Sequence, residues 1–113
     1  MSKTIEFSIG ERIAALKLFD VFKGDFASTA VLLEDVKQFP VKDEELEAAG
    51  LVKTPNDNGT TTWKWDDTVG VKEITLQDAT LNFFKDELKR KSDAGEITLA
   101  DVALISINKK VNA

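Results

Sequence analysis

The chain has 113 residues, a formal net charge of −5 and an apolar fraction of 42%, and it contains neither histidine nor cysteine. This length suits a single domain over residues 1–113, and the lack of cysteine excludes disulfides and thiolate metal sites. The negative charge disfavours binding to nucleic acid or to anionic membranes. The chain also lacks histidine, cysteine and tyrosine, so few side chains remain for catalysis. The composition therefore favours a non-enzymatic protein without a cofactor.

Residues 4–7 are predicted to form a short strand that enters the first helix. In Glu6–Glu11 an apolar residue precedes Ser8, and an acid follows three residues later. The hydroxyl can accept a hydrogen bond from a free backbone N–H while the acid lies in the electropositive first turn, which is typical of a helix start. The helix is predicted over about Ile9–Phe22 and should end where Gly24 adopts a left-handed conformation.

The side chains of this first helix are apolar around most of its circumference. Its narrow polar side comprises Arg12, Lys17 and Asp20. A helix of this kind is buried between neighbours, so we expect it at the centre of the fold.

A second helix is predicted within Asp25–Phe39, and Pro40 ends it because the residue before a proline avoids the helical region. Its apolar residues recur at helical spacing, which predicts its buried face. A short third helix over about 42–49 is closed by Gly50, and the three helices resemble a compact helix-turn-helix unit. The recurring apolar residues are Phe26, Ala30, Leu33 and Val36.

A β-hairpin is predicted for residues 51–65, because Asn58-Gly59 lies between β-forming residues and both members tolerate positive φ. A two-residue turn there would fix three opposed pairs, whereas a three- or four-residue loop would shift every pair. Pro55 cannot donate a backbone hydrogen bond, so the first arm should be an edge strand. The pairs of the two-residue turn are Val52 with Trp65, Thr54 with Trp63, and Lys53 with Lys64.

Two further copies of the helix-start pattern follow the hairpin, with Thr75 and Thr98 as the hydroxyl residues. We interpret the recurrence as independent use of a good cap rather than as a repeat, because the intervening sequence shows no similar period. The pattern predicts a fourth helix over about Leu76–Lys91, after a strand over 71–74. It also predicts a last helix over about Leu99–Asn108, although residues 102–107 could also form a strand.

These elements predict an α+β fold: a mostly helical single domain with three N-terminal helices, one β-hairpin and two C-terminal helices. Their order resembles that of winged-helix domains. In that family the third helix commonly enters the major groove of DNA and the hairpin acts as a wing. Here the third helix carries four acids, which DNA phosphates would repel. These acids are Asp43, Glu44, Glu45 and Glu47.

Two groups of residues are candidates for binding a protein partner. Trp63 and Trp65 share one face of a strand, with Lys64 between them, and would form either an aromatic platform or a roof over the core, of which the roof is favoured. The four acids of the third helix would form either a patch that faces a partner or a solvated first turn, of which the solvated turn is favoured.

The candidates for other functions have weaker patterns. The basic cluster of the fourth helix and the hairpin lysines would contact nucleic acid, but Asp86 and Glu87 interrupt the cluster and cations are common at helix ends. Asp57, Asp66 and Asp67 flank the hairpin without the spacing of a calcium loop, so no metal site is predicted. The nucleic-acid candidates are Lys53, Lys64, Lys85, Lys89, Arg90 and Lys91.

The layout also resembles small proteins of unknown function encoded by bacteriophages and prophages. The resemblance rests on the segments Ser8–Arg12, Trp63–Trp65 and Asp93–Leu99. It implies the cytoplasm of a host cell as the setting and a partner protein as the target, and it transfers no catalytic residue.

We therefore predict a non-enzymatic protein-interaction module located in the cytoplasm, because no apolar run has the length of a signal peptide or of a bilayer span. The alternative is a nucleic-acid-associated regulator of winged-helix-like form. A carboxylate-dependent metal enzyme is a third class.

Overall fold

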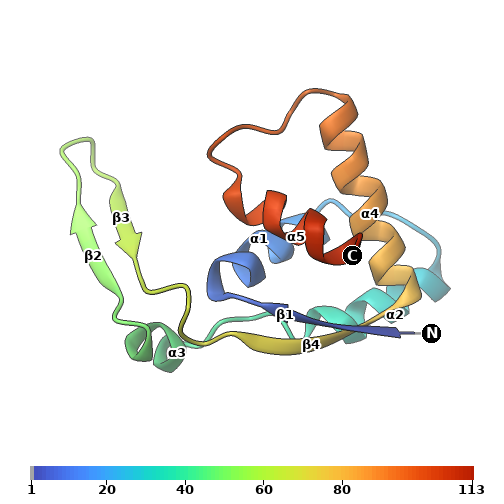
Figure 1. Cartoon of the computed structure of the whole chain (residues 1–113), viewed down its shortest axis with the longest axis horizontal. Helices are drawn as coiled ribbons and strands as arrows, with labels where there is room; N and C mark the ends of the chain where they lie inside the picture. The colour runs from blue at the N-terminus through green and yellow to red at the C-terminus, as the bar shows by residue number, and fades with distance from the viewer. Residues whose placement is uncertain (1) are drawn as a thin grey trace.

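The computed structural model describes residues 2–113 and has an α+β fold (Figure 1). Five helices and four strands lie in this part of the chain, which confirms the predicted class. The strands form two separate antiparallel pairs, β1 with β4 and β2 with β3. The elements are β1 (Ser2–Phe7), α1 (Ile9–Phe19), α2 (Phe26–Val36), α3 (Asp43–Ala48), β2 (Val52–Pro55), β3 (Thr61–Lys64), β4 (Lys72–Gln77), α4 (Asp78–Asp93) and α5 (Val102–Val111).

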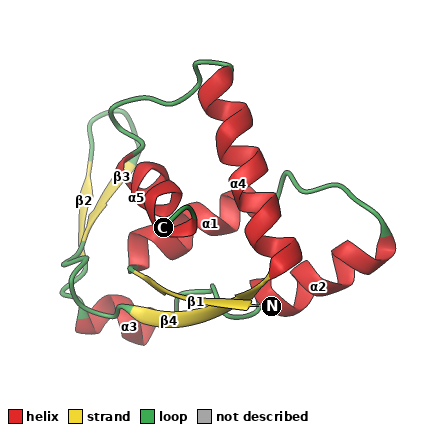
Figure 2. Ribbon diagram, turned by 45° about the vertical axis from the view of Figure 1, so that its right-hand side comes forward, coloured by secondary structure: helices red, strands yellow, loops and turns green. Residues whose placement is uncertain are grey.

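The centre of the fold is the ribbon formed by β1 and β4. The two strands pair along their whole length, from Ser2 opposite Gln77 to Phe7 opposite Lys72. Alternate side chains point to one face and are buried there, because successive residues of a strand point to opposite sides. Helices α1, α4 and α5 lie over this ribbon (Figures 1 and 2). The buried side chains of the ribbon are Ile5, Phe7, Ile74 and Leu76.

Aromatic rings join the helices to the ribbon. The ring of Phe39 meets that of Phe7 at a centroid distance of 5.1 Å and that of Phe19 at 5.2 Å, both edge to face. Phe84 of α4 meets Phe19 in the same way at 5.1 Å. Edge-to-face pairs add about 0.5–1.5 kcal/mol each beyond the area that they bury, so the cluster stabilises the contact between the two layers.

Two of the three helix-start patterns behave differently from the prediction. Ser8 closes the start of α1 as predicted, since its hydroxyl accepts from the Glu11 N–H at 3.1 Å and Glu11 accepts from the Ser8 N–H at 2.9 Å. Thr75 instead lies inside β4, where its hydroxyl bonds to that of Thr4 at 2.8 Å. The prediction of a helix capped by Thr75 is wrong, because pairing with β1 extends the strand to Gln77.

Thr98 also precedes a turn rather than a helix. Its backbone N–H donates to Asp101 Oδ2 at 2.9 Å, and the Asp101 N–H donates to the Thr98 carbonyl at 3.1 Å. The predicted helix start at Leu99 is therefore wrong, and α5 begins at Val102 once this turn is complete. Residues 102–107 are helical, which decides between the two alternatives for this segment.

The end and the polar side of the first helix also differ from the prediction. α1 ends at Phe19, and Gly24 lacks the left-handed φ that was assigned to it. An added Cβ at this position would lie only 2.7 Å from the ring of Phe22, so a larger residue would require that ring to move. Arg12, which belongs to the polar side of the helix, is 1% exposed because backbone carbonyls and Glu45 accept all of its hydrogen bonds.

α2 turns toward the core a different face from the one that its apolar spacing predicts. Phe26 and Leu33 are 96% and 58% exposed, and Ala30 is exposed as well. The buried residues of the helix are Leu32 and Asp35. The carboxylate of Asp35 bonds to the start of α4, and this contact fixes the orientation of the helix.

Candidate functional site

The β-hairpin stands away from the helices and is the most accessible part of the fold (Figure 1). We call residues 52–64 the hairpin arm. Every residue of β2 and β3 is exposed. The strands of the arm are therefore available for contact with another molecule.

A three-residue loop closes the hairpin arm. The Asn56 N–H donates to the Thr60 carbonyl at 2.8 Å, and Gly59 has a φ of +82°, as in a type I turn followed by a left-handed residue. The two-residue turn is therefore wrong, because Asn58 Oδ1 accepts from the Thr60 N–H at 3.1 Å and holds the longer loop. The register shifts by one residue. The strands pair Val52 with Lys64, Lys53 with Trp63, Thr54 with Thr62, and Pro55 with Thr61.

Trp63 is the largest side chain of the hairpin arm and is 47% exposed. Lys53 lies opposite it across the strands, with its Nζ 4.5 Å from the centroid of the indole ring. This is the geometry of a cation–π contact, which at an exposed site favours this orientation of the ring by about 0.5–1 kcal/mol. Lys64 points to the other face of the hairpin and is exposed. The two strands thus carry two lysines and no acid, on a chain with a net charge of −5.

Trp65 has a different environment from Trp63, although both lie on the same side of the chain. It is half-buried against a small apolar cluster that contains Ile9 and Leu46. Its Nε1 donates to Asp67 Oδ1 at 2.7 Å, and the same oxygen accepts from the backbone N–H of Gly10 at 2.8 Å. Trp65 therefore anchors the base of the hairpin arm to α1. Trp65 covers this apolar cluster, as the roof alternative describes, whereas Trp63 is exposed.

Asp67 is held as a carboxylate at this anchor. Partial burial raises its pKa, but the hydrogen bonds from Trp65 and from the Gly10 backbone outweigh burial and lower the pKa below the ordinary value. The charge also lies at the N-terminus of α1, where the helix dipole favours an anion.

The free edges of the hairpin arm are not equivalent. In an antiparallel pair of strands, the backbone N–H and C=O groups of one opposed pair of residues bond to each other, and those of the next opposed pair face outward. Because Asn56 bonds to Thr60, the backbone groups of Thr61 and Trp63 face outward on β3. On β2 the outward position of Pro55 has no N–H, which interrupts that edge. The edge of β3 can therefore accept a further strand more readily than the edge of β2.

The acids of α3 lie below the hairpin arm, where the Asp66 N–H donates to the Ala49 carbonyl at 2.8 Å. Glu45 is not free, because Arg12 Nη1 and Nη2 donate to its two oxygens at 2.8 and 3.1 Å. This contact lowers the pKa of Glu45 from 4.5 to about 2. The other acids of the helix are exposed and remain available to a partner. They are Asp43, Glu44 and Glu47.

The low pKa of Glu45 predicts a loss of stability in acid. Because the folded-state pKa lies below the unfolded value, the ion pair stabilises the fold fully above pH 4.5 and less as the pH falls toward 2. The Glu45 side chain is 30% exposed. Solvent screening therefore limits the effect to roughly 1–2 kcal/mol.

Urea unfolding of the wild type and of Glu45→Gln at several pH values measures this contribution. The free energy of unfolding should differ between the two at neutral pH, and the difference should shrink as the pH approaches the folded-state pKa of about 2. A difference that stays constant over this range would contradict the assignment.

The basic candidates do not form one surface. On α4, Lys89 pairs with Asp93 at 2.8 Å, and Arg90 pairs with Glu87 at 2.8 Å. Lys85 and Lys91 lie on the same helix, whereas the arm lysines Lys53 and Lys64 lie at the opposite end of the molecule (Figure 1). Two of the four basic residues of the helix are therefore balanced by ion pairs with neighbouring acids.

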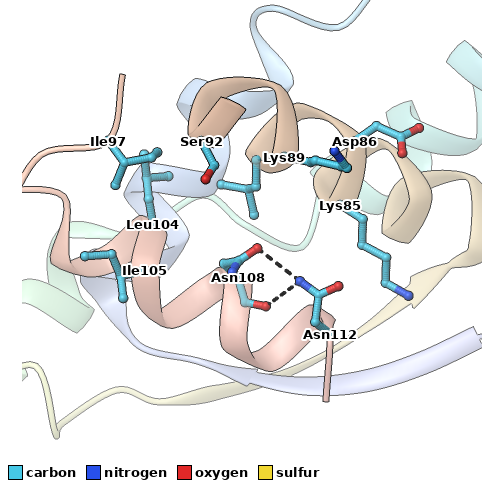
Figure 3. A pocket seen from close by; sticks show the side chains of 10 residues that line it. Lys85, Asp86, Lys89, Ser92, Ile97, Leu104, Ile105, Asn108 and Asn112 are labelled. Atoms are coloured by element: carbon cyan, nitrogen blue, oxygen red, sulfur yellow. Dashed lines mark hydrogen bonds between the residues drawn. The ribbon is translucent and has the colours of Figure 1, made fainter. Parts of the chain in front are cut away.

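Sequence reasoning missed a groove of about 440 Å³ between α4 and α5 (Figure 3). Ile97, Leu104 and Ile105 gather at one end, and Lys85 and Asn112 lie at the other. A single carboxylate, that of Asp86, is among the lining residues, so the groove offers shape and amide contacts rather than acid–base chemistry. No local pattern encodes this groove, because it depends on the angle between two helices.

Two further kinds of site concern residues 2–113, a metal site and a membrane-spanning helix. In this range no three acidic side chains are placed to hold one metal ion, and Asp66 and Asp67 bond to different neighbours. None of the helices described has both the length and the apolar character needed to cross a bilayer.

Comparison with known proteins adds no relative. No protein-family model, curated protein or solved structure matches this chain.

Proposed function

We propose that this chain is a non-enzymatic module that binds a protein partner through the hairpin arm. The observation that carries the proposal is the indole of Trp63, which is 47% exposed and lies against the ammonium group of Lys53. Tryptophan is enriched among the residues that dominate binding energy at interfaces, and a ring held in one orientation loses little entropy on binding.

The open edge of β3 supports a specific mode of binding. An extended segment of the partner would add a third strand there, with hydrogen bonds to the outward backbone groups of Thr61 and Trp63. Two-stranded hairpins are only marginally stable in water, so a third strand would also stabilise the hairpin arm. The two lysines of the arm favour a partner segment that carries acids.

Chemical crosslinking in an extract of the native host, with the tagged wild type and two variants, tests the proposal. Trp63→Ala should weaken capture of a specific partner by at least about tenfold, since it removes the central anchor. Val52→Thr is the matched control, because Val52 is 57% exposed on the other face of the hairpin arm and threonine keeps its shape. Equal capture by all three proteins would refute the assignment of Trp63.

A proline substitution separates strand addition from contact with the indole ring alone. Thr61→Pro removes one outward N–H and leaves the bonds between β2 and β3 in place, as the native Pro55 does on the opposite strand. Partner capture should fall in this variant while Trp63 remains present. Unchanged capture would exclude strand addition and would leave contact with the Trp63 ring as the mode of binding.

The proposed setting is the cytoplasm of a host cell, in line with the resemblance to phage-encoded proteins. A mobility shift with duplex DNA at low salt distinguishes the nucleic-acid alternative. A shift that occurs with the wild type and disappears in the Lys53→Ala and Lys64→Ala variants would show that the partner is nucleic acid and not protein.

A further inference from the structure

The outward face of α2 is an apolar surface that the proposed function does not use. Phe26 is 96% exposed and Leu33 is 58% exposed, and Ala30 lies between them on the same side of the helix. An aromatic side chain with so little cover is unusual, because burial of one such ring removes about 150–250 Å² from water. The face is therefore a candidate for contact with another molecule.

A groove of about 290 Å³ runs beside this face, between α2 and the end of α1. Phe22, Leu33 and Val36 supply its apolar walls. Leu33 belongs to both the exposed stripe and the groove. A projecting aromatic ring and an apolar recess of sufficient size for it thus occupy one surface.

We propose that this surface pairs two copies of the chain about a two-fold axis. A two-fold interface uses the same patch on both molecules, so the patch must present both the projecting group and its recess. In an antiparallel arrangement centred between Ala30 and Leu33, Phe26 of each copy lies opposite Lys37 of the other and enters the groove at its Val36 end. The small side chain of Ala30 allows the two helices to approach closely.

The charges at the two ends of α2 suit the same arrangement. Asp25 caps the start of the helix by accepting from the Ser28 N–H at 2.7 Å, and Lys37 follows its last residue. Antiparallel pairing places Lys37 of each copy beside Asp25 of the other. Among residues 2–113, the one ion pair of Lys37 is an exposed contact with Glu34 at 3.0 Å, so its ammonium group is accessible.

The size of the surface sets the expected affinity. α2 has 11 residues, and an interface built around one such helix from each copy lies at the low end of the areas found in specific complexes. The association should therefore be weak, with a dissociation constant of roughly 10 µM to 1 mM.

Sedimentation equilibrium at concentrations from about 10 µM to about 1 mM covers this range. The average mass of the wild type should rise from 12.5 kDa toward that of a dimer. Phe26→Ser should weaken the association at least about tenfold. Leu99→Ser is the matched control, because Leu99 is 97% exposed in a loop outside this surface, and it should associate as the wild type does.

Charge reversal gives a second readout. Lys37→Glu should also weaken the dimer, whereas Lys64→Glu on the hairpin arm changes the net charge equally and should weaken it less. A wild type that remains monomeric over the whole range would overturn the proposal. The same holds if Phe26→Ser and Leu99→Ser have equal effects.

Discussion

Arg12→Ala should lower the free energy of unfolding by about 3 kcal/mol, because it leaves several buried acceptors without a donor. The guanidinium of Arg12 is 1% exposed and donates to the carbonyls of Phe39 and Pro40 at 3.2 and 2.6 Å. It also binds both oxygens of Glu45 at 2.8 and 3.1 Å. One side chain thus joins α1 to α3 and to the segment between α2 and α3. Urea unfolding followed by circular dichroism measures the loss.

An exposed ion pair provides the control for this substitution. Lys37 and Glu34 are 68% and 67% exposed and lie 3.0 Å apart. Lys37→Ala should cost no more than about 0.5 kcal/mol, since water screens such pairs. Arg12→Lys should remain well below the wild type in stability, because an ammonium group cannot reproduce the planar fork of the guanidinium. If Arg12→Ala were as mild as Lys37→Ala, the buried network would not stabilise the fold.

Asp35→Ala should have a comparable effect, again about 3 kcal/mol, because Asp35 supplies the cap that α4 lacks. Gln77 precedes this helix and makes no side-chain cap of its own. Asp35 Oδ2, on α2, instead accepts from the Gln77 N–H at 2.9 Å and from the Thr80 hydroxyl at 2.6 Å. Both Asp35 and Thr80 are buried, so the substitution leaves a hydroxyl without an acceptor. Thermal and urea unfolding give the change in stability.

A double-mutant cycle with Thr80→Val tests the cause of this loss. Valine removes the hydroxyl while it keeps the shape of the side chain. The double variant should therefore be more stable than the sum of the two single losses predicts, by about 1 kcal/mol. Strictly additive losses would show that the contact between Asp35 and Thr80 does not matter.

The comparison of Ser8 with Thr75 explains which parts of the fold a local pattern predicts. Both residues stand in the same pattern, and only Ser8 caps a helix. The difference arises from Thr4, which lies 71 positions before Thr75 and bonds to its hydroxyl across the ribbon. Pairing with a distant strand therefore removes the helix start that the local sequence predicts at Thr75.

The orientation of α2 depended on a distant contact in the same way. Its apolar spacing predicts that Phe26 and Leu33 face the core, yet the residues that the fold buries are Leu32 and Asp35. A carboxylate in a helix is normally assigned to the surface, and only the position of α4 shows that it has partners. The burial of Arg12 escaped prediction for the same reason.

The candidate site was predicted in part. The strand face shared by Trp63 and Trp65 follows from the alternation of strand residues. Their different exposure does not, because it depends on how α1 and α3 meet the base of the hairpin arm. The register of β2 against β3 could not be predicted either, since it depends on whether Asn58 closes a two-residue or a three-residue loop.

The anchor formed by Trp65 and Asp67 has a consequence for how this molecule can change. It fixes the base of the hairpin arm to the N-terminus of α1, while the strands beyond it are exposed throughout. Substitutions in those strands therefore leave the packing of the helices intact. The helical body can serve as a constant scaffold on which mutation or grafting exchanges one exposed hairpin for another.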